Sequence, residues 1–253
     1  RGDIEMEENF VDVVLLKSDG IPTYHFAHIV DDTLMRVTNV TRGEEWIASA
    51  PIHLQLFWLC GLKAPKYAHV PSIMKEDGGG KRKLSKRKDP ELSLEFYRQE
   101  GYYSRAVKVY MLTLLNSNFE EWRLGNADKP YTDFKFNINK MSVSGCLFDI
   151  VKLGDVSKNV VSKMTAEQVY NQLLAWAKEY DTDFADKLDS APDYAKAILS
   201  IGRGGKKPRK DFGRWDEVKD FINFFYDDYY TVTDAIPENF DKNDVKTSLN
   251  KFA

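Results

Sequence analysis

The sequence predicts an α/β layer followed by mostly helical domains. Short β-rich runs alternate with helix-like segments as far as Met74, and a basic loop with three consecutive glycines follows. Capped helical patterns dominate after that loop. A chain of 253 residues, 43% of them hydrophobic, is long enough for one large globular domain or two modest ones.

The first part of the chain predicts alternating strands and helices. Residues 10–17, FVDVVLLK, predict a mostly buried strand, and residues 23–35 carry apolar side chains at helical spacing. Residues 36–42 predict a second strand. Residues 43–62 predict a helix with acids in its first turn, and residues 66–74 predict a third short strand. We expect strand signals to end near this point.

Helices are predicted for the rest of the chain. Asp89 and Ser104 are each expected to cap a helix. Thr165 and Gln168 have the spacing of a capping box, which predicts a helix start. Residues 215–230 predict a final aromatic-rich helix.

Charge and composition narrow the class of protein. The formal net charge of −3 does not indicate a nucleic-acid binder, but positive charge gathers at residues 81–88 and 203–210. No apolar run reaches the roughly 20 residues that cross a bilayer, so we expect a cytoplasmic protein without a membrane partner. Cys60 and Cys146 lack metal-ligand spacing, and we expect no metal ligands and no zinc.

The basic loop at residues 81–88 carries six positive charges. A Walker phosphate loop requires Gly-Lys followed by Ser or Thr, whereas Arg82 follows Gly80 and Lys81 here. A nuclear-targeting signal leaves the interior Leu-Ser pair unexplained. The segment KLSKR, residues 83–87, resembles the Lys-Met-Ser-Lys-Ser loop of class I aminoacyl-tRNA synthetases.

The neighbouring segments extend this resemblance. Residues 17–46, KSDGIPTYHFAHIVDDTLMRVTNVTRGEEW, resemble the part of glutamyl-tRNA synthetases of the bacterial type that carries much of the glutamate pocket. KYAHVP precedes the lysine loop and LSLEFYRQEGY follows it, in the order of that family. The resemblance is clear over residues 10–153 and looser as far as residue 230.

The resemblance implies a division of the chain. Residues 1–78 correspond to the carboxyl-side half of a Rossmann-like class I catalytic domain, and residues 79–160 to the signature loop and stem-contact domain. Residues 161–253 correspond to an incomplete helical anticodon-side domain. The His-Ile-Gly-His signature of the family does not occur in the sequence. We therefore expect a piece of the enzyme that is inactive alone.

The resemblance also implies a reaction. Glutamate and ATP, with Mg2+, form glutamyl-adenylate, and the glutamyl group then passes to the 3′ end of tRNA(Glu). Lys86 matches the signature lysine that stabilises the departing pyrophosphate, Lys83 would hold the closed loop, and Ser85 would support it. Leu84, Trp46 and Glu45 are expected beside ATP.

Three residues are expected to bind glutamate. Tyr24 matches the tyrosine that hydrogen-bonds the substrate, and Arg42 matches an arginine beside the substrate carboxylate, where a planar guanidinium forms a two-pronged contact. His28 stands where some family members carry asparagine; a packed helix histidine is the alternative. The resemblance assigns tRNA contact to Lys81, Arg82, Lys88, Arg203, Lys206, Lys207 and Arg209.

Other functions remain open at this stage. The chain could bind tRNA without catalysis, or belong to a truncated paralogue that glutamylates the modified base queuosine in tRNA. A glutaminyl-tRNA synthetase is disfavoured because a β-barrel would be expected where helices are predicted. We expect a monomer. These motifs do not determine whether the intact enzyme charges only tRNA(Glu) or also tRNA(Gln).

Overall fold

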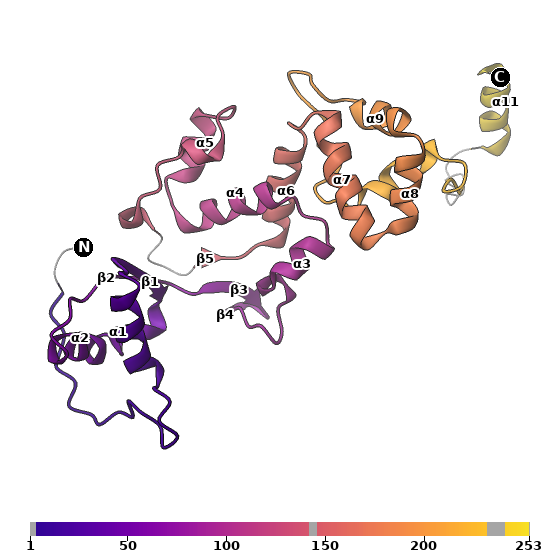
Figure 1. Cartoon of the computed structure of the whole chain (residues 1–253). Helices are drawn as coiled ribbons and strands as arrows, with labels where there is room; N and C mark the ends of the chain where they lie inside the picture. Colours follow the sequence, from indigo (N-terminus) through magenta and orange to yellow (C-terminus); the bar gives the residue numbers. More distant parts are fainter. Residues whose placement is uncertain (1–3, 142–145, 232–240, 253) are drawn as a thin grey trace.

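The computed structural model describes residues 4–141, 146–231 and 241–252. Three groups of elements follow one another along the chain (Figure 1). An α/β unit comes first, a mixed unit with a small sheet lies in the middle, and a helical unit follows.

The first unit is a strand–helix–strand crossover with one extra helix. Its elements are α1 (Tyr24–Leu34), β1 (Asn39–Gly43), the 3-10 turn η1 (Glu44–Trp46), α2 (Ala50–Leu59) and β2 (Lys66–Val70). β1 and β2 are parallel, with Arg42 opposite His69. Parallel neighbours need a long connection, and α2 is that connection. Ile29, Leu56 and Phe57 form the core between the helices and the strands.

Two predictions for this unit are wrong. Residues 10–17 form no strand; only an isolated bridge joins Leu16 to Pro22, and the Phe10 side chain is 86% exposed. A β-rich run becomes a strand only when a neighbour supplies the hydrogen-bonding ladder, and no described strand lies beside it. The single helix predicted over residues 43–62 is instead η1 followed by α2, which has Pro51 in its first turn.

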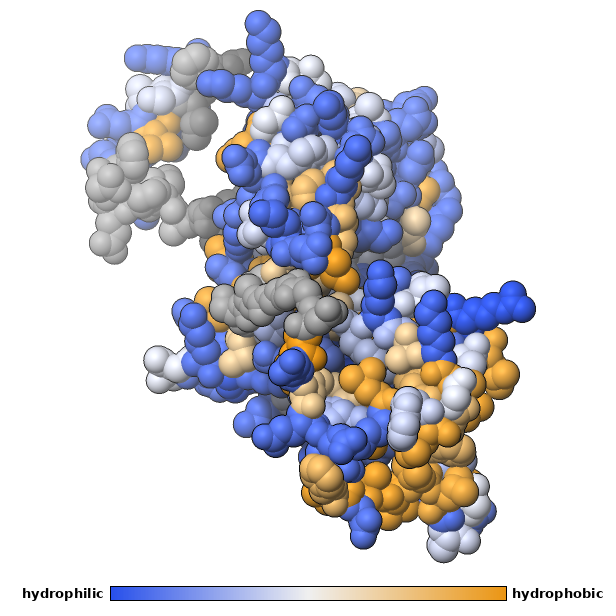
Figure 2. All heavy atoms as spheres, turned by 90° about the vertical axis from the view of Figure 1, so that its left-hand side faces the viewer, coloured by the Kyte–Doolittle hydropathy of each residue, from blue (hydrophilic) through white to orange (hydrophobic). Residues whose placement is uncertain are grey.

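Figure 2 shows apolar side chains gathered over this end of the molecule.

The middle unit begins with the sheet β4–β3–β5, made of β3 (Ile73–Asp77), β4 (Gly80–Lys83) and β5 (Cys146–Leu147). β3 and β4 form an antiparallel hairpin whose turn needs two glycines, because Gly78 and Gly79 have φ of 57° and 88°. Strand structure therefore continues past Met74, contrary to the prediction. The described residues contain no strand after β5.

Helices and 3-10 turns complete the middle unit. They are η2 (Pro90–Leu92), α3 (Leu94–Gln99), α4 (Ser104–Leu115), α5 (Phe119–Gly125), η3 (Tyr131–Asp133), η4 (Ile138–Lys140) and α6 (Ile150–Val161). Asp89 stands at the N-cap position of η2, followed by Pro90 as predicted, but its side chain forms no capping hydrogen bond. Ser93, not Asp89, caps α3 by accepting a hydrogen bond from the Glu95 amide, because the Asp89 carboxylate is taken by Arg82. Ser104 is the first residue of α4 rather than its cap.

The last unit is helical. It contains α7 (Ala166–Tyr180), α8 (Thr182–Ser190), α9 (Pro192–Ser200), α10 (Val218–Ile222), η5 (Asn223–Phe225) and α11 (Lys242–Phe252). The predicted capping box at Thr165 and Gln168 is confirmed. The helix predicted for residues 215–230 is limited to the short α10 and η5. The Trp215 amide donates to the Gly101 carbonyl at 2.9 Å, which ties this unit to the middle one.

The structure thus has the predicted α/β part followed by mostly helical units. The proposed boundary at residue 78 would divide the β3–β4 hairpin. In the part of the chain that the structure describes, no helix is long and apolar enough to span a bilayer.

Candidate active site

Arg42 lies near the carboxyl end of β1, where parallel α/β folds bind their ligands. All three nitrogens of its guanidinium are held. Nε donates to His69 Nε2 at 3.0 Å, one terminal nitrogen approaches His53 Nδ1 at 2.9 Å, and the other donates to the Trp46 carbonyl at 3.3 Å. The guanidinium also lies 4.6 Å from the centre of the Tyr67 ring. The side chain is therefore fixed in one orientation.

The four histidines of the chain all gather around this arginine. His53, from α2, is completely buried, and its Nε2 lies 3.0 Å from His25 Nδ1. Burial, and then the Arg42 charge, lower the pKa of His53 to about 3. The same two causes lower the pKa of His69. Both imidazoles are consequently neutral at pH 7 and can accept hydrogen bonds from Arg42.

His28 is held by partners within the protein. Its Nε2 lies 2.8 Å from the Tyr67 hydroxyl, its Nδ1 lies 2.8 Å from Asp32, and the residue is 7% exposed. Burial lowers the pKa of His28, while the Asp32 carboxylate opposes that shift. Both ring nitrogens have partners within the protein, which favours a packed helix histidine, and a contact between His28 and glutamate stays a prediction.

Tyr24 and Trp46 form the rim of the site. Their ring centres are 4.5 Å apart, and Tyr24 is 46% exposed. The Trp46 ring also lies 5.9 Å from the Arg42 guanidinium carbon. An accessible phenol beside a fixed guanidinium can bind a small carboxylate, through one neutral and one charge-assisted hydrogen bond.

The lysine loop is anchored at its base. The Arg82 guanidinium donates to both oxygens of Asp89 at 2.6 and 2.7 Å, and the Ser85 amide donates to the same carboxylate at 2.7 Å. These bonds hold the pKa of Asp89 well below its usual range. Asp89 is thus the residue that shapes the turn at residues 85–88.

The Leu84 side chain packs into the core, and its expected place beside ATP stays a prediction. Its side chain is 6% exposed and packs with Tyr97 and Tyr110, and its amide donates to the Ile73 carbonyl. The residue acts as an apolar anchor, because it continues the inward alternation of β4 into the loop.

An ion pair connects the lysine loop to the Arg42 site. Lys83 Nζ lies 3.2 Å from Glu45 Oε1, three residues after Arg42 in sequence. A backbone hydrogen bond, and then Lys83, lower the pKa of Glu45. Lys86 is exposed, and no ion pair of its ammonium group occurs among the described residues. The ammonium group of Lys86, three residues after Lys83 in the same loop, is therefore accessible to a ligand.

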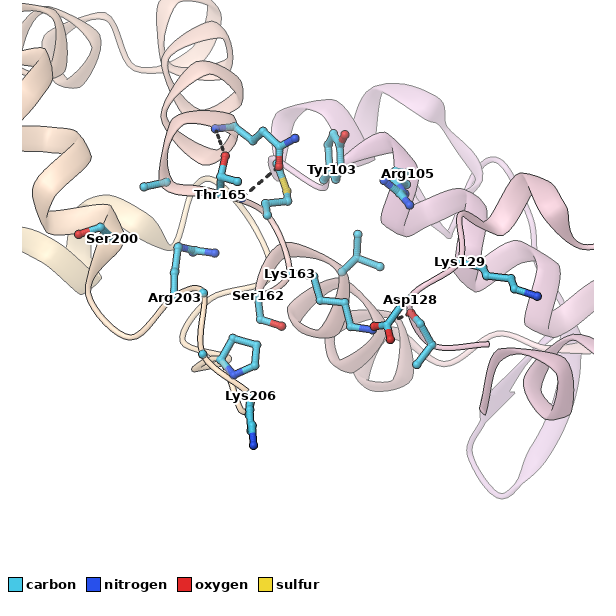
Figure 3. A pocket seen from close by; sticks show the side chains of 18 of the residues that line it. Tyr103, Arg105, Asp128, Lys129, Ser162, Lys163, Thr165, Ser200, Arg203 and Lys206 are labelled. Carbon is cyan, nitrogen blue, oxygen red and sulfur yellow. Dashed lines mark hydrogen bonds between the residues drawn. The ribbon is translucent and has the colours of Figure 1, made fainter. Parts of the chain in front are cut away.

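A second site is a cationic groove of about 680 Å³ between the middle and helical units. Figure 3 shows Arg105 and Lys129 on one side, Arg203 on the other, and Lys163 between them. The described lining includes only one carboxylate. The cations that line the groove are Arg105, Arg123, Lys129, Lys163, Arg203 and Lys206.

The residues expected to touch tRNA divide into two groups. Three arginines already bind the protein itself. Arg82 binds Asp89, Arg209 pairs with Asp211 at 3.0 Å, and Arg203 donates to the carbonyls of Leu199 and Val161. The four lysines of the set are exposed: Lys81, Lys88, Lys206 and Lys207.

The groove contains cations that sequence reasoning missed. Arg105, Arg123, Lys129 and Lys163 come from separate elements, so no local charge run signalled them. His53 was also missed, because a single histidine in an apolar helix resembles a core residue. Within the described ranges, no cluster of three His, Cys, Asp or Glu side chains is placed to hold a metal ion.

A fixed guanidinium thus lies at the end of a parallel strand, and an ion pair from nearby Glu45 joins the same segment to the lysine loop. The family described as tRNA synthetases class I (E and Q), catalytic domain, matches residues 1–154, and the chain belongs to it.

Relatives of this chain are glutamate–tRNA ligases. That of Acetivibrio thermocellus is 52% identical over 252 residues, which cover 100% of this chain and 46% of that protein. That of Clostridium perfringens is 50% identical over 256 residues and is covered to 47%. The chain thus spans less than half the length of these curated relatives.

Solved structures show the same likeness. The crystal structure of a glutamate tRNA ligase from Elizabethkingia meningosepticum, in complex with its amino acid, aligns with a TM-score of 0.64 at 26% identity. The alignment covers 92% of this chain and 45% of that one. The glutamate–tRNA synthetase of Elizabethkingia anophelis aligns with a TM-score of 0.63.

Proposed function

We propose that this chain supplies the glutamate pocket and the lysine loop of a glutamate–tRNA ligase. In that reaction a carboxylate oxygen of glutamate attacks the α-phosphate of ATP, pyrophosphate leaves, and the glutamyl group then moves to the 3′ end of tRNA(Glu). The observation that carries the proposal is the Lys83–Glu45 ion pair, because it brings the two halves of this chemistry together.

The glutamate pocket and the lysine loop each have a role that the chemistry of their side chains supports. Tyr24 and Arg42 bind a substrate carboxylate, since Arg42 is fixed and Tyr24 is accessible. Lys86 stabilises the negative charge that grows on the departing pyrophosphate, and Lys83 holds the loop closed. Trp46 and Glu45 line the nucleotide side. ATP arrives with Mg2+ as a substrate, and the protein is a cytoplasmic monomer.

The cationic groove is assigned to the tRNA backbone. Six lining cations against one carboxylate produce a positive field that attracts phosphates. Exposed Lys81 and Lys88 on the lysine loop, and Lys207 beside the groove, extend this surface. A second candidate function follows from the same observation: the chain alone binds tRNA without catalysis.

The test is glutamate-dependent exchange of pyrophosphate into ATP, in the presence of tRNA. The intact protein that contains this chain should catalyse exchange at about 1 per second or faster, and the 253-residue chain should not. Exchange that responds to another amino acid and not to glutamate would overturn the proposal.

Salt dependence tests the tRNA surface. Affinity of the chain for tRNA(Glu) should fall steeply with salt, and Lys163→Ala with Lys206→Ala should reduce the slope of log Kd against log salt by about 1 to 2. Lys246→Ala in α11, an exposed lysine outside the groove, is the matched control. An unchanged slope in the groove variant would exclude the groove.

A further inference from the structure

Every nitrogen of the Arg42 guanidinium has a hydrogen-bond partner, yet none of these partners carries a negative charge. Its partners are two imidazoles and a backbone carbonyl. No carboxylate within the described ranges forms an ion pair with Arg42; Asp32, an acid of this cluster, pairs with His28 instead. Arg203 is likewise held by backbone carbonyls alone, whereas other arginines of the chain pair with carboxylates. Arg82, for example, is neutralised by Asp89 and Asp77.

We propose that His53 is the positioning residue of Arg42: a buried neutral acceptor that orients the guanidinium without cancelling the charge that recognises the substrate carboxylate. The inference rests on the function proposed above and deepens it by naming the residue that sets the strength of glutamate recognition. His53 itself touches no substrate in this arrangement, since it is completely buried behind Arg42 and Tyr24.

The hydrogen-bond directions follow from the chemistry of arginine. A guanidinium only donates, so His53 Nδ1 must carry no proton. A neutral imidazole then carries its proton on Nε2, which lies 3.0 Å from His25 Nδ1 and donates to it. If His53 were protonated, its Nδ1–H would face an N–H of Arg42, and the positive charges of the two side chains would repel each other. Burial and the neighbouring Arg42, His28 and His25 charges all disfavour that form, which agrees with the low pKa of His53.

Other side chains at this position would fail for different reasons. An apolar residue would leave one guanidinium nitrogen without an acceptor in a place that water does not reach. A carboxylate would accept the hydrogen bond, but it would also form an ion pair with Arg42 and repel the incoming anionic substrate. A neutral acceptor is the solution that satisfies both requirements.

The experiment compares His53→Asn with His53→Asp in the intact protein. The two side chains have nearly the same shape, and each offers an oxygen close to the position of Nδ1, but only Asp brings a negative charge. With ATP and tRNA saturating, we expect the Asn variant to keep the KM for glutamate within about threefold of wild type. The Asp variant should raise it by about 10-fold or more, with the KM for ATP and kcat unchanged.

A control separates this effect from the general cost of burying a charge. Asn116 is 1% exposed and lies in the middle unit, so Asn116→Asp makes the same change away from Arg42. It should leave the KM for glutamate unaltered. Equal KM values for the Asn and Asp variants of His53, or an equal rise for Asn116→Asp, would overturn the inference.

A spectroscopic measurement decides the matter even if a variant fails to fold. Nitrogen-15 NMR of histidine-labelled wild type at pH 7 should show His53 protonated at Nε2 and unprotonated at Nδ1. A proton on Nδ1 would overturn the inference. Absence of glutamate-dependent exchange in the wild type would sink the proposed function instead, and the NMR result would still decide whether His53 positions Arg42.

Discussion

Arg42→Lys keeps a positive charge in the glutamate pocket and removes the planar fork. In the structure the guanidinium contacts three acceptors on three different elements: His69 on β2, His53 on α2 and the Trp46 carbonyl on η1. A single ammonium on a flexible stem cannot reach all three in the same geometry. The lysine would therefore be held in several orientations, and the substrate carboxylate would lose its two-pronged partner.

The expected cost follows from these contacts. A hydrogen bond that involves a charged group contributes about 1.5 to 3 kcal/mol, and the variant loses one such bond to the substrate as well as its own orientation. We expect kcat/KM for glutamate to fall about 30- to 160-fold, which corresponds to a loss of about 2 to 3 kcal/mol of transition-state stabilisation.

The assay is pyrophosphate exchange in the intact protein, with glutamate and ATP varied separately. A thermal melt of each variant checks folding, because His53 and His69 lose a donor. Arg98→Lys is the matched control: the Arg98 side chain is 66% exposed and contacts only Glu95 at 3.8 Å among the charged groups that the structure describes. Arg98→Lys should leave kcat/KM unchanged both for glutamate and for ATP.

Two results would refute this reasoning. A similar loss in kcat/KM for ATP would mean that Arg42 organises the whole unit and not the glutamate pocket. Full activity toward glutamate would mean that the guanidinium fork does not contact the substrate.

The remaining predictions concern catalysis, packing and titration. Lys86→Ala should lower adenylate formation by about 100-fold or more with little change in glutamate affinity, and a kcat within about threefold of wild type would exclude its role. Gly101→Ala should destabilise the fold by at least about 1 kcal/mol more than Gly204→Ala in urea. Both glycines have positive φ, but a Cβ at Gly101 would lie 2.7 Å from the Trp215 amide, whereas one at Gly204 meets nothing within 4 Å; equal costs would contradict this packing. Burial raises the pKa of Asp216 from 3.8 to about 6, so the folded state binds the proton more tightly and wild-type stability falls as pH rises through that range. Asp216→Asn should therefore raise the melting temperature relative to wild type more at pH 7 than at pH 4, and the same difference at both pH values would argue against it.

The sequence alone determined the features that depend on neighbouring residues. The box at Thr165 and Gln168 formed as predicted, because both hydrogen bonds lie within one helical turn. The alternation of helix α1 with strands β1 and β2 followed from apolar spacing. The lysine loop was recognisable because its chemistry is contained in five consecutive residues.

Only the tertiary structure decided which distant groups meet. His53 and His69 lie 11 and 27 residues after Arg42, and they reach it because β1 pairs with β2 in parallel while α2 crosses over them. Residues 10–17 have the composition of a strand, but a strand needs a partner for its backbone groups, and composition does not supply one. Leu84 belongs to a signature loop, yet the alternation of β4 turns its side chain into the core. Local patterns fix the elements through short-range hydrogen bonds and apolar spacing, whereas the chemistry of this site depends on contacts that exist only after those elements pack.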